Sequence, residues 1–192
     1  MLSLEQLTID INQKTLLNKV NVTFLNSSIT YLQGSNGSGK TSLLRVLARV
    51  MEPSTGKVIY DSDSTINYIG HDLGLKQELA VIDHLKFWSS IYDSHITLKA
   101  AVHYFNLEDL LDKKIYQLSA GNQKKTALAK LLCCKADLWL LDEASTNLDE
   151  MNQKLLNNLI ISKANNGGII ILTSHNDHYI KNANFLNLAD FK

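Results

Sequence analysis

A short glycine-rich segment near the start of the chain has the residue types and spacing of a phosphate-binding loop. Residues 34–41 read Gly-Ser-Asn-Gly-Ser-Gly-Lys-Thr, which fits the pattern G-x-x-x-x-G-K-[ST]. Backbone N–H groups can wrap a polyphosphate only where glycines let the main chain come close. Lys40 would place a cation against the β- and γ-phosphates, and Thr41 would offer a hydroxyl to Mg²⁺. We expect the phosphates to be bound by Gly34, Ser35, Asn36, Gly37, Ser38, Gly39, Lys40, Thr41 and Ser42.

Much further along the chain, a second segment could supply a metal-binding and a catalytic carboxylate. Residues 136–143 read Ala-Asp-Leu-Trp-Leu-Leu-Asp-Glu, an apolar strand that ends in two acids. Asp142, at the carboxyl edge of a parallel sheet, would hold Mg²⁺ through water. Glu143, one residue on, would face the opposite way and act on the attacking water. The alternative is a solvated pair of surface acids, which the apolar strand before them disfavours.

The apolar periodicities predict the elements that would position these groups. Residues 29–33 alternate and are β-branched, as in a strand, and a helix with a buried apolar face is expected from about Lys40 to Val50. That helix would stop before Pro53, the single proline. Further strands are predicted at residues 2–11, 20–25, 56–60, 65–69, 169–173 and 185–188, and a further helix at 151–164.

A stretch of mostly helical periodicity, about residues 72–135, would form an arm inserted in the core. Four of its side chains fall on one helical face with Phe87 beside them: Leu85, Trp88, Ser89 and Tyr92. These side chains would pack the small core of the arm itself, or some of them would line a groove for a helix of a membrane partner.

Three further segments carry a family resemblance. Residues 118–123 read Leu-Ser-Ala-Gly-Asn-Gln and resemble the signature loop of ATP-binding-cassette (ABC) ATPases. Residues 141–149 look like the acidic strand of that family and the loop after it, which ends in Asp149. Residues 170–175 are similar to its last core strand with a switch histidine, His175. With the phosphate loop, these motifs follow the family's order and span most of the chain.

The resemblance implies a fold, a mechanism and a dimer. The fold would be α/β, a P-loop NTPase of the ABC type with a mixed core sheet, an N-terminal antiparallel β subdomain and a helical arm. In the family two ATPase units pack head to tail, so each Mg·ATP would lie between the phosphate loop of one chain and Ser119 and Gly121 of the other. Asp149 would help to form this contact. The catalytic residues would be Glu143, which polarises the lytic water, His175, which contacts the γ-phosphate, and Lys40.

The chain departs from the family pattern at several positions. His71 stands where a glutamine usually joins the core to the helical arm, and its imidazole could still bond a metal-bound water, so it joins Thr41 and Asp142 as a candidate metal-site residue. Asn122 replaces a glutamine and Ala144 a proline, and both changes look tolerable. The aromatic residue that normally stacks on adenine would fall near residues 10–11, which are Asp and Ile, so recognition of the base is expected to be weak or apolar.

Other segments point to one subfamily. Residues 68–76, 85–88, 118–129 and 136–139 resemble the ATP-binding subunit of the cytochrome c maturation machinery. In that system the subunit docks beneath an integral membrane partner, and its hydrolysis is associated with haem export or with release of the haem-loaded chaperone. The resemblance therefore implies a peripheral protein at the cytoplasmic face of the inner membrane. Four histidines are read as surface or site residues and not as haem ligands: His71, His84, His95 and His103.

Length and composition agree with this interpretation. The 192 residues can bury a full core as one ATPase domain over residues 1–192. No apolar run reaches the length of about eighteen residues that a membrane span needs. With nineteen basic and nineteen acidic residues the net charge is zero, so the electrostatic footprint of a nucleic-acid-binding protein is missing. Cys133 and Cys134 are adjacent on a predicted apolar helix and are expected to be reduced core thiols.

Other functions stay open at this point. The chain could be the ATPase subunit of another small ABC exporter. It could also be a soluble ABC ATPase of repair or translation, although no coiled coil, zinc insertion or tandem cassette is present in the sequence. A nucleotide-binding module that signals without hydrolysis is disfavoured, because Lys40, Asp142, Glu143 and His175 are all in place.

Overall fold

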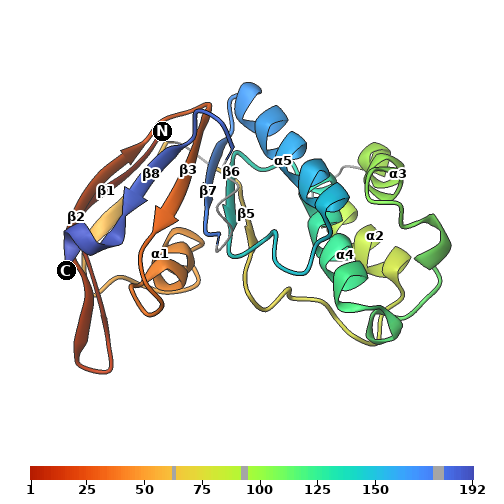
Figure 1. Cartoon of the computed structure of the whole chain (residues 1–192), viewed down its shortest axis with the longest axis horizontal. Coiled ribbons are helices and arrows are strands. Elements are labelled where there is room, and N and C mark those ends of the chain that lie inside the picture. The colour runs from red at the N-terminus through yellow and green to blue at the C-terminus, as the bar shows by residue number, and fades with distance from the viewer. Residues whose placement is uncertain (62–63, 92–94, 175–179) are drawn as a thin grey trace.

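The computed structural model describes residues 1–61, 64–91, 95–174 and 180–192 (Figure 1). The strands are β1 Leu2–Ile11, β2 Lys14–Phe24, β3 Ser28–Gln33, β4 Thr55–Tyr60, β5 Ile66–Ile69, β6 Leu138–Leu141, β7 Ile169–Leu172 and β8 Asn184–Asn187. The α-helices are α1 Lys40–Leu47, α2 Val81–Ile91, α3 His95–Tyr104, α4 Ala120–Cys133 and α5 Glu150–Asn165. Short 3₁₀ turns occur at η1 Glu108–Leu110, η2 Ile115–Gln117 and η3 Leu188–Phe191.

The strands separate into two sheets, which refines the expectation of a mixed core sheet. β1, β2 and β4 pair antiparallel in the order β2-β1-β4. Within the described residues the core strands pair only in parallel, in the order β5-β6-β7-β3-β8. The patterns explain the separation. β6 and β7 are buried at every position, as strands covered on both faces are, whereas β1 and β2 mix buried with exposed positions.

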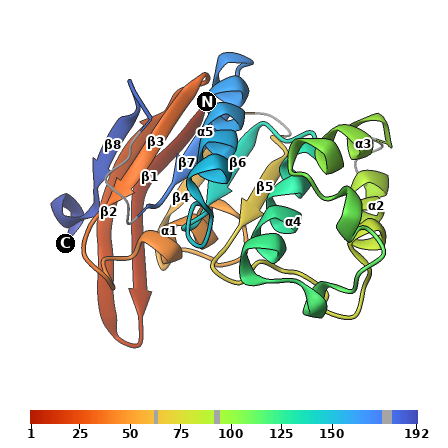
Figure 2. The same ribbon diagram turned by 45° about the vertical axis from the view of Figure 1, so that its right-hand side comes forward.

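Alternate residues of the parallel strands face two different apolar cores. Leu138 and Leu140 of β6 pack with α1 and with the antiparallel sheet. Trp139 and Leu141 point the other way and pack with the residues of α2, α4 and α5. Figure 1 shows the result, with the antiparallel strands at one end, α2, α3 and α4 at the other, and the parallel sheet between them. Figure 2 shows α5 crossing in front of the parallel strands.

Helix α1 is shorter than its sequence pattern predicts. It ends at Leu47. Val50, which the apolar pattern places on the buried face, is 66% exposed. The chain turns away because Arg49 takes a left-handed conformation with φ 59°. The apolar face that does pack consists of Leu43, Leu44, Val46 and Leu47.

The stretch 72–135 contains the predicted helices but also irregular chain. Residues 72–80 form no helix, and the 3₁₀ turns η1 and η2 lie between α3 and α4. On α2, Leu85 and Ser89 are buried as predicted, whereas Phe87 is 46% exposed. Tyr92 lies outside the described residues. The idea that part of this surface receives a partner helix stays a prediction.

The two cysteines lie at the end of α4, are both buried and are not joined in a disulfide. Burial raises the pKa of Cys133 to about 12 and that of Cys134 to about 11. Both values lie far above neutral pH, so these thiols stay protonated, in keeping with the predicted packing role.

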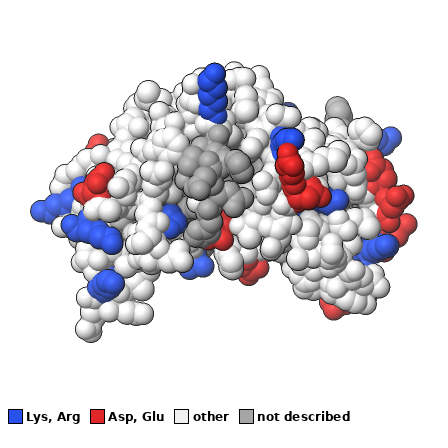
Figure 3. Space-filling model, viewed as in Figure 1, with Lys and Arg blue, Asp and Glu red and all other residues white. Residues whose placement is uncertain are grey.

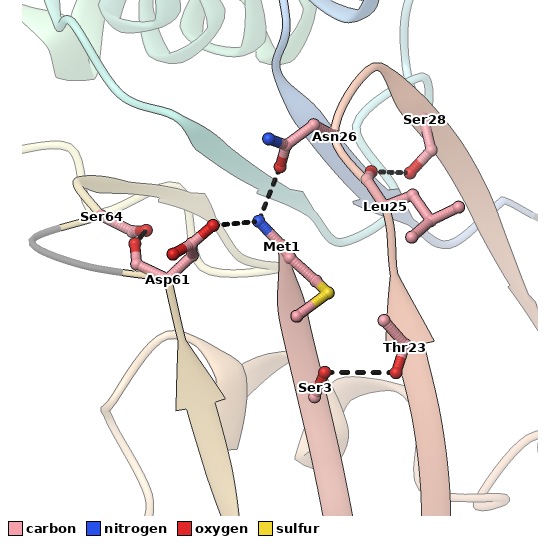
Figure 4. A network of polar contacts seen from close by, with 8 residues as sticks. All are labelled: Met1, Ser3, Thr23, Leu25, Asn26, Ser28, Asp61 and Ser64. Atoms are coloured by element: carbon pink, nitrogen blue, oxygen red, sulfur yellow. Dashed lines mark hydrogen bonds and ion pairs between the residues drawn. The ribbon is translucent and has the colours of Figure 1, made fainter.

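Polar contacts connect the beginning of β1 to the neighbouring strands (Figure 4). The Met1 ammonium group donates to Asn26 Oδ1 at 2.6 Å and pairs with Asp61 Oδ2 at 3.3 Å. One residue pair further along, the hydroxyls of Ser3 and Thr23 lie 3.1 Å apart. These contacts fix the ends of β1, β2 and β4 relative to one another.

On the face seen in Figure 3, several basic side chains lie near the end that carries the antiparallel strands and several acidic ones at the end of the arm, with mostly neutral surface between them. Charges of both signs are present, in keeping with the net charge of zero. Among the described residues, no helix combines the length and the apolar character that crossing a bilayer requires.

A cation and two rings join the arm to the core. Lys130 Nζ on α4 lies 4.2 Å from the ring centroid of Trp88 on α2 and donates to the Tyr68 carbonyl of β5 at 3.2 Å. Trp88 Nε1–H donates to His84 Nε2 at 3.2 Å. Burial, helped by the charges of Lys130 and Lys76, lowers the pKa of His84 from 6.5 to about 4. His84 is therefore neutral in the folded protein at neutral pH.

The buried His84 predicts a fall in stability under mildly acidic conditions. Below pH 6.5 the unfolded chain takes up a proton at this residue, whereas the folded chain does so only at about pH 4. The free energy of unfolding should therefore be highest above pH 6.5 and should lose about 3 kcal/mol as the pH falls to about 4. Urea unfolding at a series of pH values measures this loss.

The matched variant is His84→Gln, which keeps an acceptor for Trp88 but does not titrate. Its free energy of unfolding should depend less steeply on pH between these two values. Equal slopes for the wild type and the variant would show that His84 does not cause the loss.

Candidate active site

The glycine-rich segment forms the turn between β3 and α1, as the sequence predicts. Gly39 is the N-cap of α1 and has φ 102°, a conformation that residues with a Cβ rarely adopt. Gly34 has φ 148°, and a Cβ at this position would collide with the Ser38 hydroxyl. No side chain caps the first turn of α1, so its N–H groups and the positive end of the helix dipole remain available to an anion.

The loop surrounds a hollow of about 240 Å³, and its lysine lies across it. Residues 36–42, Leu16 and Glu143 line this hollow. Lys40 Nζ donates to the carbonyls of Gly34 at 2.7 Å and Ser35 at 3.1 Å. The structure therefore brings together the predicted phosphate-binding residues, and it adds the predicted base Glu143 to the same wall.

Asp142 lies immediately after β6, at the carboxyl edge of the parallel sheet, and is only 2% exposed. Its Oδ1 accepts a hydrogen bond from Thr173 Oγ1 at 2.7 Å. Its Oδ2 is buried and has no hydrogen-bond partner within the part of the chain that the structure describes. A buried carboxylate oxygen without a hydrogen-bond partner destabilises the folded protein. Mg²⁺ prefers oxygen ligands and ordered waters, so this oxygen is suited to the metal shell.

Glu143 is held by its main chain. Its backbone has φ 51°, a left-handed conformation that is uncommon for a residue with a side chain. The N–H group donates to Thr173 Oγ1 at 2.9 Å, and the carbonyl accepts from Lys124 Nζ at 3.0 Å. The side chain is 24% exposed, and Oε2 lies 3.9 Å from Nδ1 of His71.

A second hollow of about 300 Å³ lies on the other side of Glu143. Its lining includes His71 and Gln77 from the loop after β5, Lys124 from α4, and Asn147 from the loop after β6. The structure therefore places His71, predicted as a possible metal-site residue, beside Glu143. With an 81% exposed side chain, His71 is open to solvent there.

The predicted signature residues lie at the beginning of α4. Ser119 is the N-cap, and its Oγ accepts from the Asn122 N–H at 3.3 Å. Gly121 lies close to the Asn147 carbonyl. Of the described residues that line the phosphate-loop hollow, none comes from α4. Within one chain, the signature residues and the phosphate loop therefore form separate sites.

The remaining two predicted residues are placed less directly. Asp149 is the N-cap of α5, where its Oδ1 accepts from both the backbone N–H and the side-chain amide of Asn152 at 2.8 Å. A role for Asp149 in a subunit contact stays a prediction. His175 lies outside the described residues.

Two residues of the site, Thr173 and Lys124, were not singled out from the sequence. Thr173 follows the apolar strand β7 directly, so a hydroxyl at the carboxyl edge of a parallel sheet was the available signal. Lys124 is a lysine on the buried side of a helix and is only 6% exposed. Lysine is almost never this buried without a partner, so helical periodicity could have marked it as unusual.

The match to a family model decides the classification. Residues 17–146, more than half of the chain, match the model described as ABC transporter. The chain belongs to the ABC transporter family. As an ABC ATPase it has curated relatives that extend over nearly its whole length.

Two of these relatives are named cytochrome c biogenesis ATP-binding export protein CcmA. The ABC ATPase is 54% identical to the protein of this name from Rickettsia bellii over 196 residues, which cover 98% of this chain and 100% of the relative. It is 35% identical to that from Wolbachia pipientis wMel, with 91% of this chain and 89% of the relative covered.

Solved structures agree on the fold of the ABC ATPase. An ABC transporter ATP-binding protein from Pyrococcus furiosus superposes with a TM-score of 0.84 at 23% identity and covers 100% of this chain and 98% of its own. An ATP-binding cassette solved as a dimer in a post-hydrolysis state with ADP and phosphate has a TM-score of 0.81 at 19% identity, with 92% and 88% covered. The predicted fold class is thereby confirmed.

The geometry of the ABC ATPase predicts a strong effect of Thr173→Val. The variant keeps the shape but removes the hydroxyl that donates to Asp142 and accepts from the Glu143 N–H. Two buried polar groups lose a partner, so the free energy of unfolding should fall by about 2 kcal/mol, and kcat should fall with it. Thr173→Ser retains the hydroxyl and serves as the control. Chemical denaturation and steady-state ATPase assays measure both effects, and a Thr173→Val protein with wild-type kcat would contradict the bridging role.

Proposed function

We propose that the chain, as a single ABC ATPase domain over residues 1–192 with a helical arm, is the ATP-hydrolysing subunit of an export complex for cytochrome c biogenesis. The observation that supports this most is the 54% identity to a cytochrome c biogenesis ATP-binding export protein, over 98% of this chain and 100% of the relative. That identity favours cytochrome c biogenesis over another small exporter, and the family match favours transport over a soluble repair or translation ATPase. Haem export and chaperone release are both compatible with this role.

The phosphate loop would bind the triphosphate of ATP. Backbone N–H groups of residues 34–42 and the first turn of α1 would wrap the phosphates, and Lys40 would exchange its two carbonyl partners for phosphate oxygens. Thr41 and Asp142 would hold Mg²⁺, with His71 as a further candidate through a bound water. When bound, Mg²⁺ supplies charge neutralisation at the β- and γ-phosphates.

Glu143 would act as the general base. Its side chain lies in the wall of the phosphate-loop hollow, and its main chain is held on both sides, so the carboxylate can be aimed at a water beside the γ-phosphate. His175 would contact that phosphate from the segment after Ser174. These roles follow the family resemblance and the position of Glu143.

The functional unit would be a head-to-tail homodimer that closes on ATP. No described residue that lines the phosphate-loop hollow comes from α4, which supports an arrangement in which Ser119 and Gly121 contact the nucleotide of a second chain. Dimers of ATP-binding cassettes exist among the structures with this fold. ATP would be shared between the two chains, and hydrolysis would remove the phosphate that joins them.

The partner would be an integral membrane subunit, and the site of action the cytoplasmic face of the inner membrane. The word export in the relatives' name supports a membrane partner. The exposed Phe87 on α2 is a candidate for part of the contact.

The decisive test compares Glu143→Gln with the wild type. The variant should bind Mg·ATP with wild-type affinity, accumulate as a dimer and lose at least about 100-fold in kcat, because the base is gone while the phosphate loop is intact. Size-exclusion chromatography with ATP and a steady-state assay measure both. Pull-down from detergent-solubilised membranes in ATP should retain the membrane partner.

The control is Glu5→Gln, the same chemical change on β1 at a surface residue that pairs with Lys57. It should behave as the wild type. A Glu143→Gln protein that hydrolyses ATP normally would remove Glu143 from the role of base. A wild type that stays monomeric at saturating Mg·ATP and hydrolyses it with no dependence on protein concentration would overturn the shared site.

A further inference from the structure

We propose that Lys124 is a positioning residue that connects helix α4 to the main chain of Glu143 and so keeps the catalytic carboxylate in place. This inference rests on the proposed function, because it assumes that Glu143 acts as the base. It assigns a role to a buried side chain that takes no part in binding the phosphates.

The first observation is the depth and direction of Lys124. The residue is 6% exposed, and its Nζ donates to the Glu143 carbonyl at 3.0 Å. Burial lowers the pKa of Lys124, while the nearby carboxylates of Glu143 and Asp142 act in the opposite direction and favour the charged form. A buried ammonium group next to the catalytic acids is expensive to maintain, and here it donates to the backbone of the predicted base.

The second observation is the conformation that this contact holds. Glu143 has φ 51°, which costs free energy for any residue with a Cβ and persists only where the surroundings impose it. Thr173 holds the N–H group, and the carbonyl accepts from Lys124 Nζ at 3.0 Å and from the Thr146 N–H of its own turn at 3.1 Å. Without the lysine, the carbonyl keeps the contact with Thr146 inside its own turn but loses its connection to α4, so the turn and the carboxylate can shift relative to that helix.

The third observation is what else α4 carries. Ser119 and Gly121 stand at its first turn, and Lys124 follows Ser119 by five residues, or about 7.5 Å of helix. A helix transmits a displacement along its axis as a rigid body. When a nucleotide held by the second chain engages the first turn of α4, Lys124 therefore carries that movement to the Glu143 of its own chain. The two nucleotide sites of the dimer are joined by this hydrogen bond.

Packing alone does not account for the lysine. Its neighbours Thr126, Ala127 and Leu128 fill the buried side of α4 without charge. Methionine has nearly the same length and no charge to desolvate, and replacing a buried charge by an apolar side chain is often neutral or stabilising. A purely structural role therefore predicts no benefit from lysine at this position, whereas a positioning role predicts a loss of activity without a loss of stability.

The test is Lys124→Met in the full-length protein, with Lys125→Met as the matched control at the next, less buried residue. We expect Lys124→Met to lose about ten- to a hundred-fold in kcat, as a small misplacement of a catalytic group does. Its KM for ATP and its affinity for a fluorescent ATP analogue should stay within about threefold of the wild type, since the phosphate loop is untouched. Its melting temperature should be equal or higher. Lys125→Met should match the wild type in all four measurements.

Two more variants separate positioning from packing. Lys124→Arg keeps a charged donor and should recover a substantial part of kcat, and it also provides a readout if Lys124→Met fails to fold. In the double variant with Glu143→Gln, Lys124→Met should cause no further loss, because residues that act as a unit are not additive.

The outcomes distinguish this inference from the function on which it rests. A wild type without ATPase activity refutes the proposed function, and this inference with it. An active wild type together with a folded Lys124→Met of unchanged kcat refutes the role of Lys124 alone. A Lys124→Met protein that loses both kcat and melting temperature, with neither recovered in Lys124→Arg, also refutes it. So does a further fall in kcat when Lys124→Met is added to Glu143→Gln.

Discussion

The hydroxyl of Thr173 is the contact on which the rest of the site depends. It donates to Asp142 Oδ1 and accepts from the Glu143 N–H, so one oxygen atom at the end of β7 fixes both acids at the end of β6. Because β6 and β7 are paired in parallel, the ends of the two strands meet at the same edge, where the phosphate loop also begins. The register between β6 and β7 therefore determines where Asp142 and Glu143 lie.

That register depends in turn on burial. β6 and β7 are covered on both faces, and their alternate side chains enter two separate cores, so a shift of one residue would exchange the side chains that face the two cores. The antiparallel sheet and α1 close one core, and the arm and α5 close the other. The packing of β6 and β7 thus fixes the positions of the site residues that follow these strands, and the loops connect strands whose positions are already set.

The amino-acid sequence predicts much of this structure where the signal is local. The phosphate loop, the acidic end of β6 and most strands follow from short patterns, because glycine geometry and alternation act over a few residues. The left-handed turn at Arg49 that ends α1 has no such signal. The roles of Thr173 and Lys124 depend on hydrogen bonds to residues 19 or more positions away, which only the folded chain brings together.

The contact of Lys130 with Trp88 and with the Tyr68 carbonyl has a mechanical consequence. It connects Trp88 of α2 to strand β5, which is followed by the loop that carries His71. If a neighbouring protein displaces α2, this contact passes part of the displacement to β5 and to the loop that follows it. A movement of the arm would in this way reach His71, which lies beside Glu143, through the Lys130 ammonium group.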